Sequence, residues 1–229
     1  MKKEIRANDS NEDIEYKLML LGDTSVGKTC LFKKITTGSY NDKNVSTIGI
    51  DRRTIKVQCD LEENEVKATK NVIITLTDTA GQERFKALTK AYYRGSDAAV
   101  LIYDITERKT FDHLKEWIES IRNSASSINF NSNYIIFLIG MKIDLIESGK
   151  RQRMVEVEEA LNKCIEFNLE WGGECSNKEF TEAKYIEIFK GFIQILYEKI
   201  GTKRFRRQSV IKLEPIKKKK PRNSNCDTC

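Results

Sequence analysis

The stretch Gly22-Asp-Thr-Ser-Val-Gly27-Lys28-Thr29 decides the fold, because it fits the pattern G-x-x-x-x-G-K-[ST]. Before it, residues 16–21 form a short apolar run typical of a buried strand, and after it residues 28–37 have the pattern of a helix. Glycines between a strand and a helix let consecutive backbone N–H groups point at a phosphate, beside a helix N-terminus that favours anions. This chemistry assigns Lys28 to the β- and γ-phosphates of a nucleotide and the Thr29 hydroxyl to Mg²⁺.

The apolar runs on either side of this loop predict further strands. Residues 98–104 and 134–140 are continuously apolar, as in a parallel sheet that is buried on both faces. Residues 52–59 alternate and residues 72–76 are apolar, which predicts two more strands, with the charged segment 60–70 as a longer, solvated hairpin between them.

Helical periodicity fills the gaps between these strands. Two apolar stripes have helical spacing: Phe111, Leu114, Trp117, Ile118 and Ile121, then Ile186, Phe189, Ile193, Leu196 and Ile200. Alternating strands and helices predict an α/β fold with a single, doubly wound, mostly parallel sheet flanked by helices. Gly172 and Gly173 lie between two helical stretches, so we expect the last strand to be a poor one.

Charge divides the chain into a near-neutral body and a basic tail. Residues 201–229 carry ten Lys or Arg and two acidic residues, a balance of +8, which leaves 30 basic and 32 acidic residues in the remainder. A basic body would have indicated nucleic acid, whereas a basic tail indicates a domain tethered to an anionic surface. We therefore expect a flexible extension at 1–13, one domain at 14–200 and a disordered tail at 201–229. The amino-terminal residues lack a secretory h-region, and no apolar run approaches the ~20 residues of a spanning helix, so a cytosolic protein is expected.

A second block, Asp78-Thr-Ala-Gly81-Gln82-Glu-Arg-Phe, follows directly on the strand predicted at 72–76. An aspartate at the carboxyl end of that strand lies beside the phosphate loop, where it can hold Mg²⁺ through a water. Gly81 lets its backbone N–H approach the γ-phosphate. Gln82 is placed to orient the attacking water and is the expected catalytic residue.

Together with Tyr92-Tyr-Arg-Gly95, this block resembles the Ras superfamily of small GTPases, and within it the Rab branch, over about residues 14–200. The resemblance implies a P-loop G domain that binds GTP or GDP with Mg²⁺. Thr47, in Ser46-Thr-Ile-Gly49, matches the threonine whose hydroxyl binds Mg²⁺ and whose N–H binds the γ-phosphate, and Tyr40 matches the aromatic residue that packs on guanine. The implied phosphate-loop contacts are Ser25, Val26, Gly27, Lys28, Thr29 and Cys30, and the implied metal ligands are Thr29, Thr47 and Asp78.

The guanine pocket of the family has counterparts here, with one departure. Gly140-Met-Lys142-Ile-Asp144 stands where the family has an Asn-Lys-x-Asp box, so Asp144 would accept hydrogen bonds from guanine N1 and N2 and the Lys142 stem would pack on the base. The family asparagine is Met141, so its amide contacts to the base and to the phosphate loop are expected to be absent, at ~1–3 kcal/mol for an unpaired buried partner. Cys175-Ser176-Asn177-Lys178 resembles the Ser-Ala-Lys box, in which the backbone N–H at Asn177 reads guanine O6.

Other departures bear on partners. Arg52 follows Asp51, apparently with two residues deleted, and Thr77 precedes Asp78, where Rab-type switches usually carry Phe and Trp. Asn44 replaces the tyrosine that often closes over the γ-phosphate. The aromatic face on which Rab effectors dock is therefore largely missing, although Tyr92 remains.

The carboxyl-terminal residues resemble a two-signal membrane anchor. A lysine run at 217–220 would attract anionic lipid, and Cys226 and Cys229 are the expected prenylation sites. The alternatives are a C-a-a-X box modified at Cys226 alone, a free solvated tail, and a nuclear signal from the lysine run.

The resemblance implies a Rab-like, membrane-anchored GTP/GDP switch in vesicle trafficking. We expect a slow GTPase that acts as a monomer. It would lie on the cytoplasmic face of intracellular membranes and cycle with the cytosol. Its expected partners are an exchange factor, a GTPase-activating protein, a GDP-dissociation inhibitor or escort protein, effectors and anionic membrane, with no nucleic acid. The alternatives are a nucleotide-loaded scaffold that exchanges spontaneously because of Met141, or another branch of the superfamily.

Overall fold

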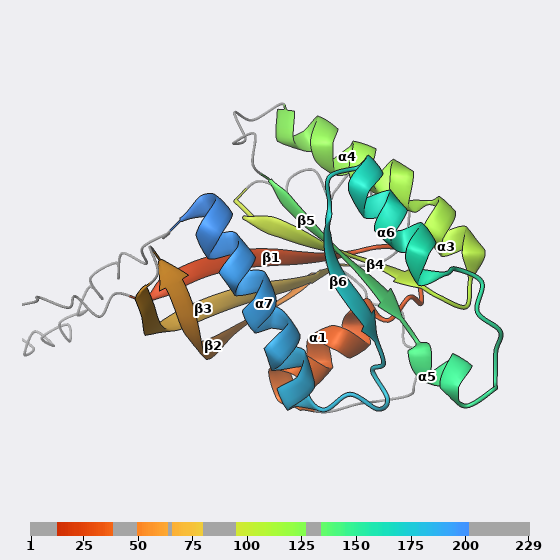
Figure 1. The fold of residues 1–229 in the computed structure, drawn as a ribbon, viewed down its shortest axis with the longest axis horizontal. Helices are drawn as coiled ribbons and strands as arrows, with labels where there is room; N and C mark the ends of the chain where they lie inside the picture. The colour runs from red at the N-terminus through yellow and green to blue at the C-terminus, as the bar shows by residue number, and fades with distance from the viewer. Residues whose placement is uncertain (1–12, 39–49, 64–65, 80–94, 127–133, 202–229) are drawn as a thin grey trace, which may run out of the picture.

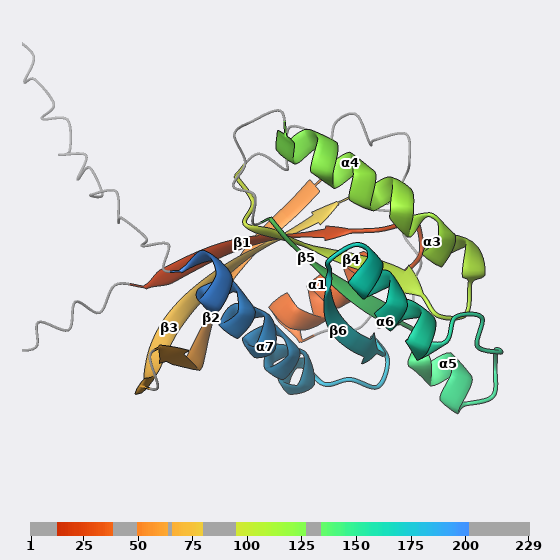
Figure 2. The same cartoon turned by 45° about the horizontal axis from the view of Figure 1, so that its top comes forward.

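The computed structural model describes residues 13–38, 50–63, 66–79, 95–126 and 134–201. Within these ranges a six-stranded sheet has the order β2-β3-β1-β4-β5-β6 and helices cover both faces (Figure 1, Figure 2). The strands are β1 Ile14–Leu21, β2 Ile50–Glu63, β3 Val66–Thr79, β4 Ala98–Asp104, β5 Ile135–Met141 and β6 Glu170–Cys175. The helices are α1 Lys28–Thr37, α3 Arg108–Asp112, α4 Leu114–Ser126, α5 Ile143–Glu147, α6 Val157–Glu166 and α7 Glu182–Ile200. β2 pairs with β3 antiparallel and the other neighbouring strands are parallel, which confirms the predicted doubly wound sheet.

Alternate residues of the central strands belong to two hydrophobic clusters, one on each face of the sheet. In β4, Val100 and Ile102 pack in the cluster that includes α1 and α7, whereas Leu101 and Tyr103 pack with α3, α4 and α6. All seven residues of β4 and all seven of β5 are buried, because neither face of these strands reaches solvent. The continuous apolar runs in the sequence are thus explained.

Both predicted helical stripes face the core. The first is divided between α3 and α4, which are separated by His113, and its five members are buried. In α7, Phe189, Ile193 and Leu196 are buried, while Ile186 and Ile200 are partly buried. Among the described helices, none combines the length and apolar composition needed to cross a membrane.

The hairpin predicted at 60–70 is present between β2 and β3, but its strands are longer than predicted and part of its inner face is buried. The antiparallel ladder continues to the pair formed by Glu63 and Val66. Cys59 and Leu61 are buried in the cluster that contains α7, and the Lys70 ammonium donates a hydrogen bond to the Tyr197 hydroxyl at 3.2 Å. The strands were predicted too short because the charged side chains on the outer face hid the alternating buried positions on the inner face.

The last strand, β6, forms at the edge of the sheet with an irregular register between Leu138 and Gly140 of its neighbour. Gly172 is required by packing, since a Cβ there would lie 2.7 Å from the Phe192 ring, whereas Gly173 has φ 89°, a conformation that favours glycine. Phe192 stacks on Phe137 with ring centroids 4.0 Å apart. The absence of a side chain at Gly172 therefore lets α7 approach the sheet. The sequence predicted a poor last strand, and β6 is irregular but paired with β5.

Candidate nucleotide-binding site

The phosphate loop joins β1 to α1 through backbone conformations that its glycines permit. Gly22 has φ 134° and Gly27 has φ 112°. A Cβ at Gly22 would lie 2.1 Å from the Ile102 carbonyl oxygen, so a larger residue does not fit. Gly27 is the N-cap of α1 and has no side chain with which to cap the first turn. The positive end of α1 therefore faces the loop, as anion binding requires.

Lys28 is folded back on the loop that precedes it. Its ammonium donates hydrogen bonds to the carbonyl oxygens of Gly22 and Asp23, at 2.9 and 2.6 Å, and the side chain is 5% exposed. Burial lowers the pKa of Lys28 to about 8, although the nearby carboxylates of Asp78 and Asp23 act in the opposite direction. Because both partners are neutral carbonyls, the ammonium can exchange them for anionic oxygens, to which its hydrogen bonds are stronger.

The Asp23 side chain anchors the loop to the opposite face of the sheet. One carboxylate oxygen lies 2.6 Å from His113 Nδ1, and the other accepts a hydrogen bond from Trp117 Nε1 at 2.8 Å. This contact was not predicted from the sequence. Trp117 was assigned to an apolar stripe, and its indole N–H was the signal that a polar partner was needed.

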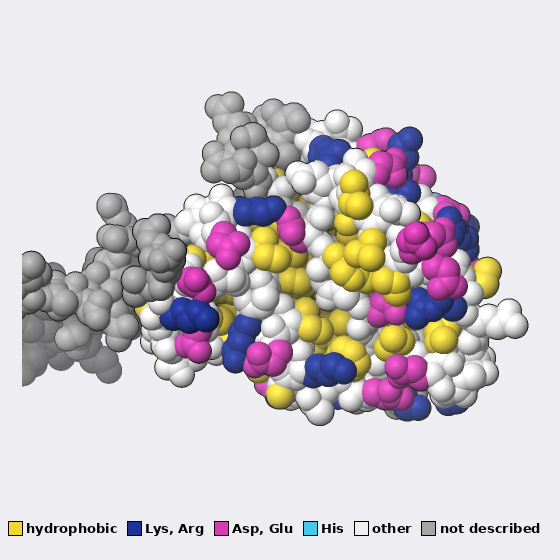
Figure 3. Space-filling model, viewed as in Figure 1, with side chains coloured by type: hydrophobic (Ala, Val, Ile, Leu, Met, Phe, Trp, Pro, Cys, Tyr) yellow, Lys and Arg dark blue, Asp and Glu magenta, His cyan; other side chains and the backbone are white. Residues whose placement is uncertain are grey.

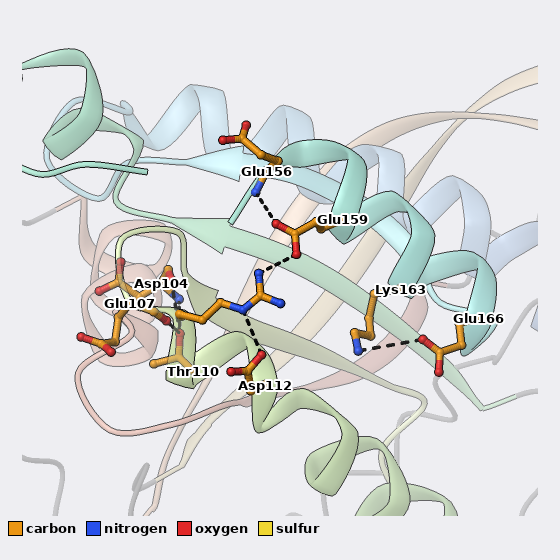
Figure 4. Close-up of polar contacts among 9 residues, drawn as sticks. Asp104, Glu107, Thr110, Asp112, Glu156, Glu159, Lys163 and Glu166 are labelled. Carbon is orange, nitrogen blue, oxygen red and sulfur yellow. Dashed lines mark hydrogen bonds and ion pairs between the residues drawn. The ribbon is translucent and has the colours of Figure 1, made fainter. Parts of the chain in front are cut away.

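Asp104, at the end of β4, holds the cationic side chain of the guanine box. The Lys142 ammonium lies 2.6 Å from Asp104 Oδ2, and Oδ1 accepts hydrogen bonds from the backbone N–H and the hydroxyl of Thr106. Helix α3, which follows, is joined to α6, because its Arg108 guanidinium pairs with Glu159; Glu159 is labelled in Figure 4. The Lys142 ammonium is thus held by Asp104 at the end of β4.

Asp144 and Ser176 bring the two predicted guanine segments together. The Ser176 hydroxyl donates a hydrogen bond to Asp144 Oδ1 at 2.7 Å and accepts hydrogen bonds from the backbone N–H groups of Lys178 and Glu179. The Lys142 N–H also donates to the Cys175 carbonyl at 2.9 Å. The carboxylate of Asp144 is consequently oriented, with Oδ1 already bonded to Ser176.

Met141 supplies no amide to the phosphate loop, as expected, but the structure has a different link between the guanine segments and that loop. Met141 is fully buried and apolar, as its sequence position suggested. The Asn177 side chain, which was assigned no role, instead donates a hydrogen bond from Nδ2 to the Gly27 carbonyl at 3.0 Å. A link to the phosphate loop is therefore present, but it comes from the other guanine segment.

Asp78 lies at the carboxyl end of β3, level with Leu20 of β1, and is 1% exposed. Neither carboxylate oxygen has a hydrogen-bond partner of good geometry among the described residues. Burial raises the pKa of Asp78, and the Thr29 side chain and the Lys28 ammonium nearby offset only part of that effect. A buried, unpartnered carboxylate beside a threonine side chain suits an oxygen-liganded cation such as Mg²⁺.

We expect Asp78→Asn to stabilise the nucleotide-free, metal-free protein at neutral pH by ~1–3 kcal/mol, because it removes, without changing shape, a buried charge that Thr29 and Lys28 compensate only in part. A raised carboxyl pKa means that stability of the parent falls as pH rises from about 3.9 through the folded-state value, and the variant should lose this dependence. Urea unfolding in EDTA across that pH range measures both effects. The same variant should release GDP at one rate with or without Mg²⁺; a retained Mg²⁺ effect would contradict the assignment.

Several predicted residues lie outside the described ranges: Tyr40, Thr47, Gly81, Gln82, Cys226 and Cys229. Those that are described converge on the carboxyl ends of the parallel strands. The phosphate loop follows β1, Asp78 ends β3, Lys142 and Asp144 follow β5, and Ser176 follows β6. Open α/β sheets bind their ligands at this end of the sheet, outside the carboxyl ends of the strands.

Comparison with known proteins agrees with this geometry. The model of a family described as the Ras family matches residues 17–198. The chain is 36% identical over 189 residues to Ras-related protein Rab-13 of Canis lupus familiaris, covering 82% of this chain and 83% of that one. It is 37% identical over 174 residues to Ras-related protein Rab-19 of Homo sapiens, with 76% and 72% covered. It is 40% identical over 154 residues to Ras-related protein Rab11A of Lotus japonicus, covering 66% of this chain and 61% of the relative's length.

Proposed function

The chain belongs to the Ras family and is a small GTPase related to Rab proteins, and from this premise we propose that it is a Rab-type, membrane-anchored GTP/GDP switch that acts in vesicle trafficking. One observation carries the proposal. The phosphate loop, the buried carboxylate of Asp78 and the bonded pair Asp144–Ser176 all lie at the same edge of one sheet. A nucleotide spanning that edge meets a phosphate site at one end and a base site at the other.

At the phosphate end, the backbone of Ser25, Val26 and Gly27 and of the first turn of α1 would surround the β-phosphate. The Lys28 ammonium would exchange its two carbonyl partners for β- and γ-phosphate oxygens. Thr29, Asp78 and Thr47 would hold Mg²⁺, which neutralises charge developing on the phosphate oxygens. Gln82 would orient the water that attacks the γ-phosphorus, which breaks the bond to the β–γ bridging oxygen and leaves GDP and phosphate.

At the base end, Asp144 would accept hydrogen bonds from guanine N1–H and the N2 amino group, donors that adenine does not present in the same places. Ser176 keeps this carboxylate oriented. The Lys142 stem and Tyr40 would cover the faces of the base, and backbone N–H groups at Asn177 and Lys178 would lie near O6. Cys30, in the first turn of α1, would add a backbone N–H at the α-phosphate.

Equilibrium competition tests this assignment. A fluorescent GDP analogue bound to the full chain in Mg²⁺ should be displaced by GDP and GTP, and not by ADP or ATP at the same concentrations. Displacement by adenine nucleotides with equal potency would refute the guanine assignment while leaving the phosphate assignment intact.

Met141 favours a second possibility, a scaffold that stays loaded with GTP because it exchanges nucleotide spontaneously. A buried methionine provides no amide for the base. Measuring nucleotide release and single-turnover hydrolysis on the same preparation separates the two: the switch requires hydrolysis to be faster than release once an activating protein is added, and the scaffold requires release to be faster.

We place the G domain at 14–200, with 1–13 as an extension and 201–229 as the anchor. On the face seen in Figure 3, acidic and basic side chains of the body are interspersed, which suits a domain whose membrane attraction resides in its tail. The trafficking partners proposed are an exchange factor, a GTPase-activating protein, an escort or GDP-dissociation inhibitor protein, and effectors on the cytoplasmic face of a membrane.

Replacing Cys226 and Cys229 together by serine should move the protein from membranes to the soluble fraction of cells. A buried lipid chain contributes ~0.8 kcal/mol per CH₂ and is insensitive to salt, whereas the lysines are screened beyond ~8 Å at physiological ionic strength. Replacing 217–220 by glutamine is the matched control and should leave the protein bound. Fractionation with and without a high-salt wash measures this. A double serine variant that stays bound until salt removes it would show that the lysine run is the anchor.

A further inference from the structure

Asn177 occupies a position from which it can hold the two halves of the nucleotide site together. Its side chain is buried, with the residue 9% exposed. Nδ2 donates a hydrogen bond to the Gly27 carbonyl at 3.0 Å, and Oδ1 accepts one from the Tyr185 hydroxyl at 3.0 Å. Since a carbonyl oxygen only accepts, the atom facing Gly27 must be the amide nitrogen, and this fixes the orientation of the whole group.

The amide is held from the core side by α7. Tyr185 is fully buried, and burial raises the pKa of its hydroxyl, so the group remains a donor at every physiological pH. Because the acceptor Oδ1 is thereby paired, both sides of the Asn177 amide have hydrogen-bond partners. The contact with Gly27 is consequently a defined, partly buried hydrogen bond between the turn after β6 and the start of α1.

Gly27, which accepts the hydrogen bond from Asn177, lies at the start of the helix that carries the proposed phosphate contacts. Gly27 is the N-cap of α1, and its carbonyl also accepts the hydrogen bond from the Leu31 N–H at 2.9 Å. Lys28 and Thr29, the proposed phosphate and metal contacts, follow directly. A Cβ at Gly27 would lie 2.8 Å from Asn177 Nδ2, so the glycine also makes room for the amide.

Met141 approaches the same point but contributes no polar group. Its terminal methyl would lie 3.8 Å from a Cβ at Gly27, within van der Waals distance. Ser176, adjacent to Asn177, carries the hydrogen bond to Asp144. A single short segment is therefore bonded at one residue to the base-reading carboxylate and at the next to the phosphate loop.

We propose that Asn177 is a positioning residue for nucleotide retention: its amide couples the guanine pocket to the phosphate loop, and so sets the rate at which both GDP and GTP dissociate. This inference rests on the proposed function. The coupling means that neither half of the site can open without breaking the bond to Gly27, whereas without the amide Met141 leaves the loop free to separate from the base pocket.

Two variants test this together: Asn177→Asp keeps the shape and the acceptor for Tyr185 but replaces the donor to Gly27 by an oxygen and adds a negative charge, and Asn177→Ala removes the donor without adding charge. We expect Asn177→Asp and Asn177→Ala to release fluorescent GDP and GTP analogues about fivefold to tenfold faster than the parent, which is the effect of one lost hydrogen bond. The preference for guanine over adenine should be unchanged, because Asp144 and Ser176 are intact. Asn162→Ala, at an exposed asparagine of α6, is the matched control and should release nucleotide at the parent rate.

Two further variants separate positioning from loss of stability. Ile193→Val, in the buried face of α7, should lower the unfolding temperature without changing release. Tyr185→Phe should speed release in the parent background but add nothing to Asn177→Ala, since it acts through the same amide. If Asn177→Asp releases nucleotide at the parent rate, or if release follows the unfolding temperature across all variants, the inference is wrong. A parent that does not bind guanine nucleotide would instead refute the proposed function.

Discussion

Asp144→Asn is expected to weaken GDP binding by about 10²–10⁴, because two charge-assisted hydrogen bonds to the base are worth roughly 1.5–3 kcal/mol each. The same variant should gain affinity for xanthosine diphosphate. Xanthine has an oxygen where guanine has its 2-amino group, and an asparagine amide can donate to that oxygen while its carbonyl accepts from N1–H.

The structure makes this a clean substitution. Asp144 is 9% exposed and its Oδ1 accepts from the Ser176 hydroxyl, a bond that an asparagine carbonyl can retain. The orientation of the group should therefore survive and only its donor–acceptor pattern should change. Equilibrium titration with both diphosphates measures the exchange of specificity. A variant that still prefers GDP would show that Asp144 does not read the base edge.

Lys28→Met should reduce affinity for GDP and GTP by about a hundredfold or more, since it removes a buried ammonium from phosphates that would bond to it directly. The parent should also show a pH dependence that the variant lacks. In the free protein burial lowers the pKa of Lys28 to about 8, and bound phosphate would raise it, so binding takes up a proton above that pH.

Affinity of the parent should consequently be full below pH 8 and should decline as pH rises through 8. Lys33→Met, on the same helix, is the matched control and should bind like the parent. Titrations from pH 6.5 to pH 9.5 provide the measurement. An affinity of Lys28→Met equal to that of the parent would mean that Lys28 does not contact the phosphates, whereas a parent affinity that is independent of pH would mean that the pKa of free Lys28 is not lowered to about 8.

Much of the fold could be predicted from local sequence. The helix at Lys28–Thr37 was predicted with its observed bounds, because glycines with positive φ stand immediately before and after it. The central strands were found because strands buried on both faces are apolar throughout. Strands β2 and β3 were predicted too short, since Leu61 alternates with charged residues and only its packing in the cluster that contains α7 shows which face is inside.

Some residues of the candidate site could be predicted from local sequence, and others could not. Lys28, Asp78 and Asp144 were found from motifs, in which the chemistry depends on residues close in sequence. The partners that hold them were not, because these contacts join segments distant in the chain: Trp117 reaches Asp23 across 94 residues, and Asn177 reaches Gly27 across 150. Asn177 was treated as a backbone donor because, in the family that the chain resembles, the backbone N–H at this position and not the side chain reads guanine O6.

Phosphate release in a single turnover tests the central claim most directly. The full chain, loaded with GTP and freed of excess nucleotide, is mixed with Mg²⁺, and free phosphate is followed with time, with Gln82→Leu as the matched control. We predict slow release of about one phosphate per bound GTP from the parent, and GTP that stays bound but intact in the variant, because only the residue that orients water has changed. Equal phosphate release from both proteins would contradict the role of Gln82, and no release from either would contradict a hydrolytic switch.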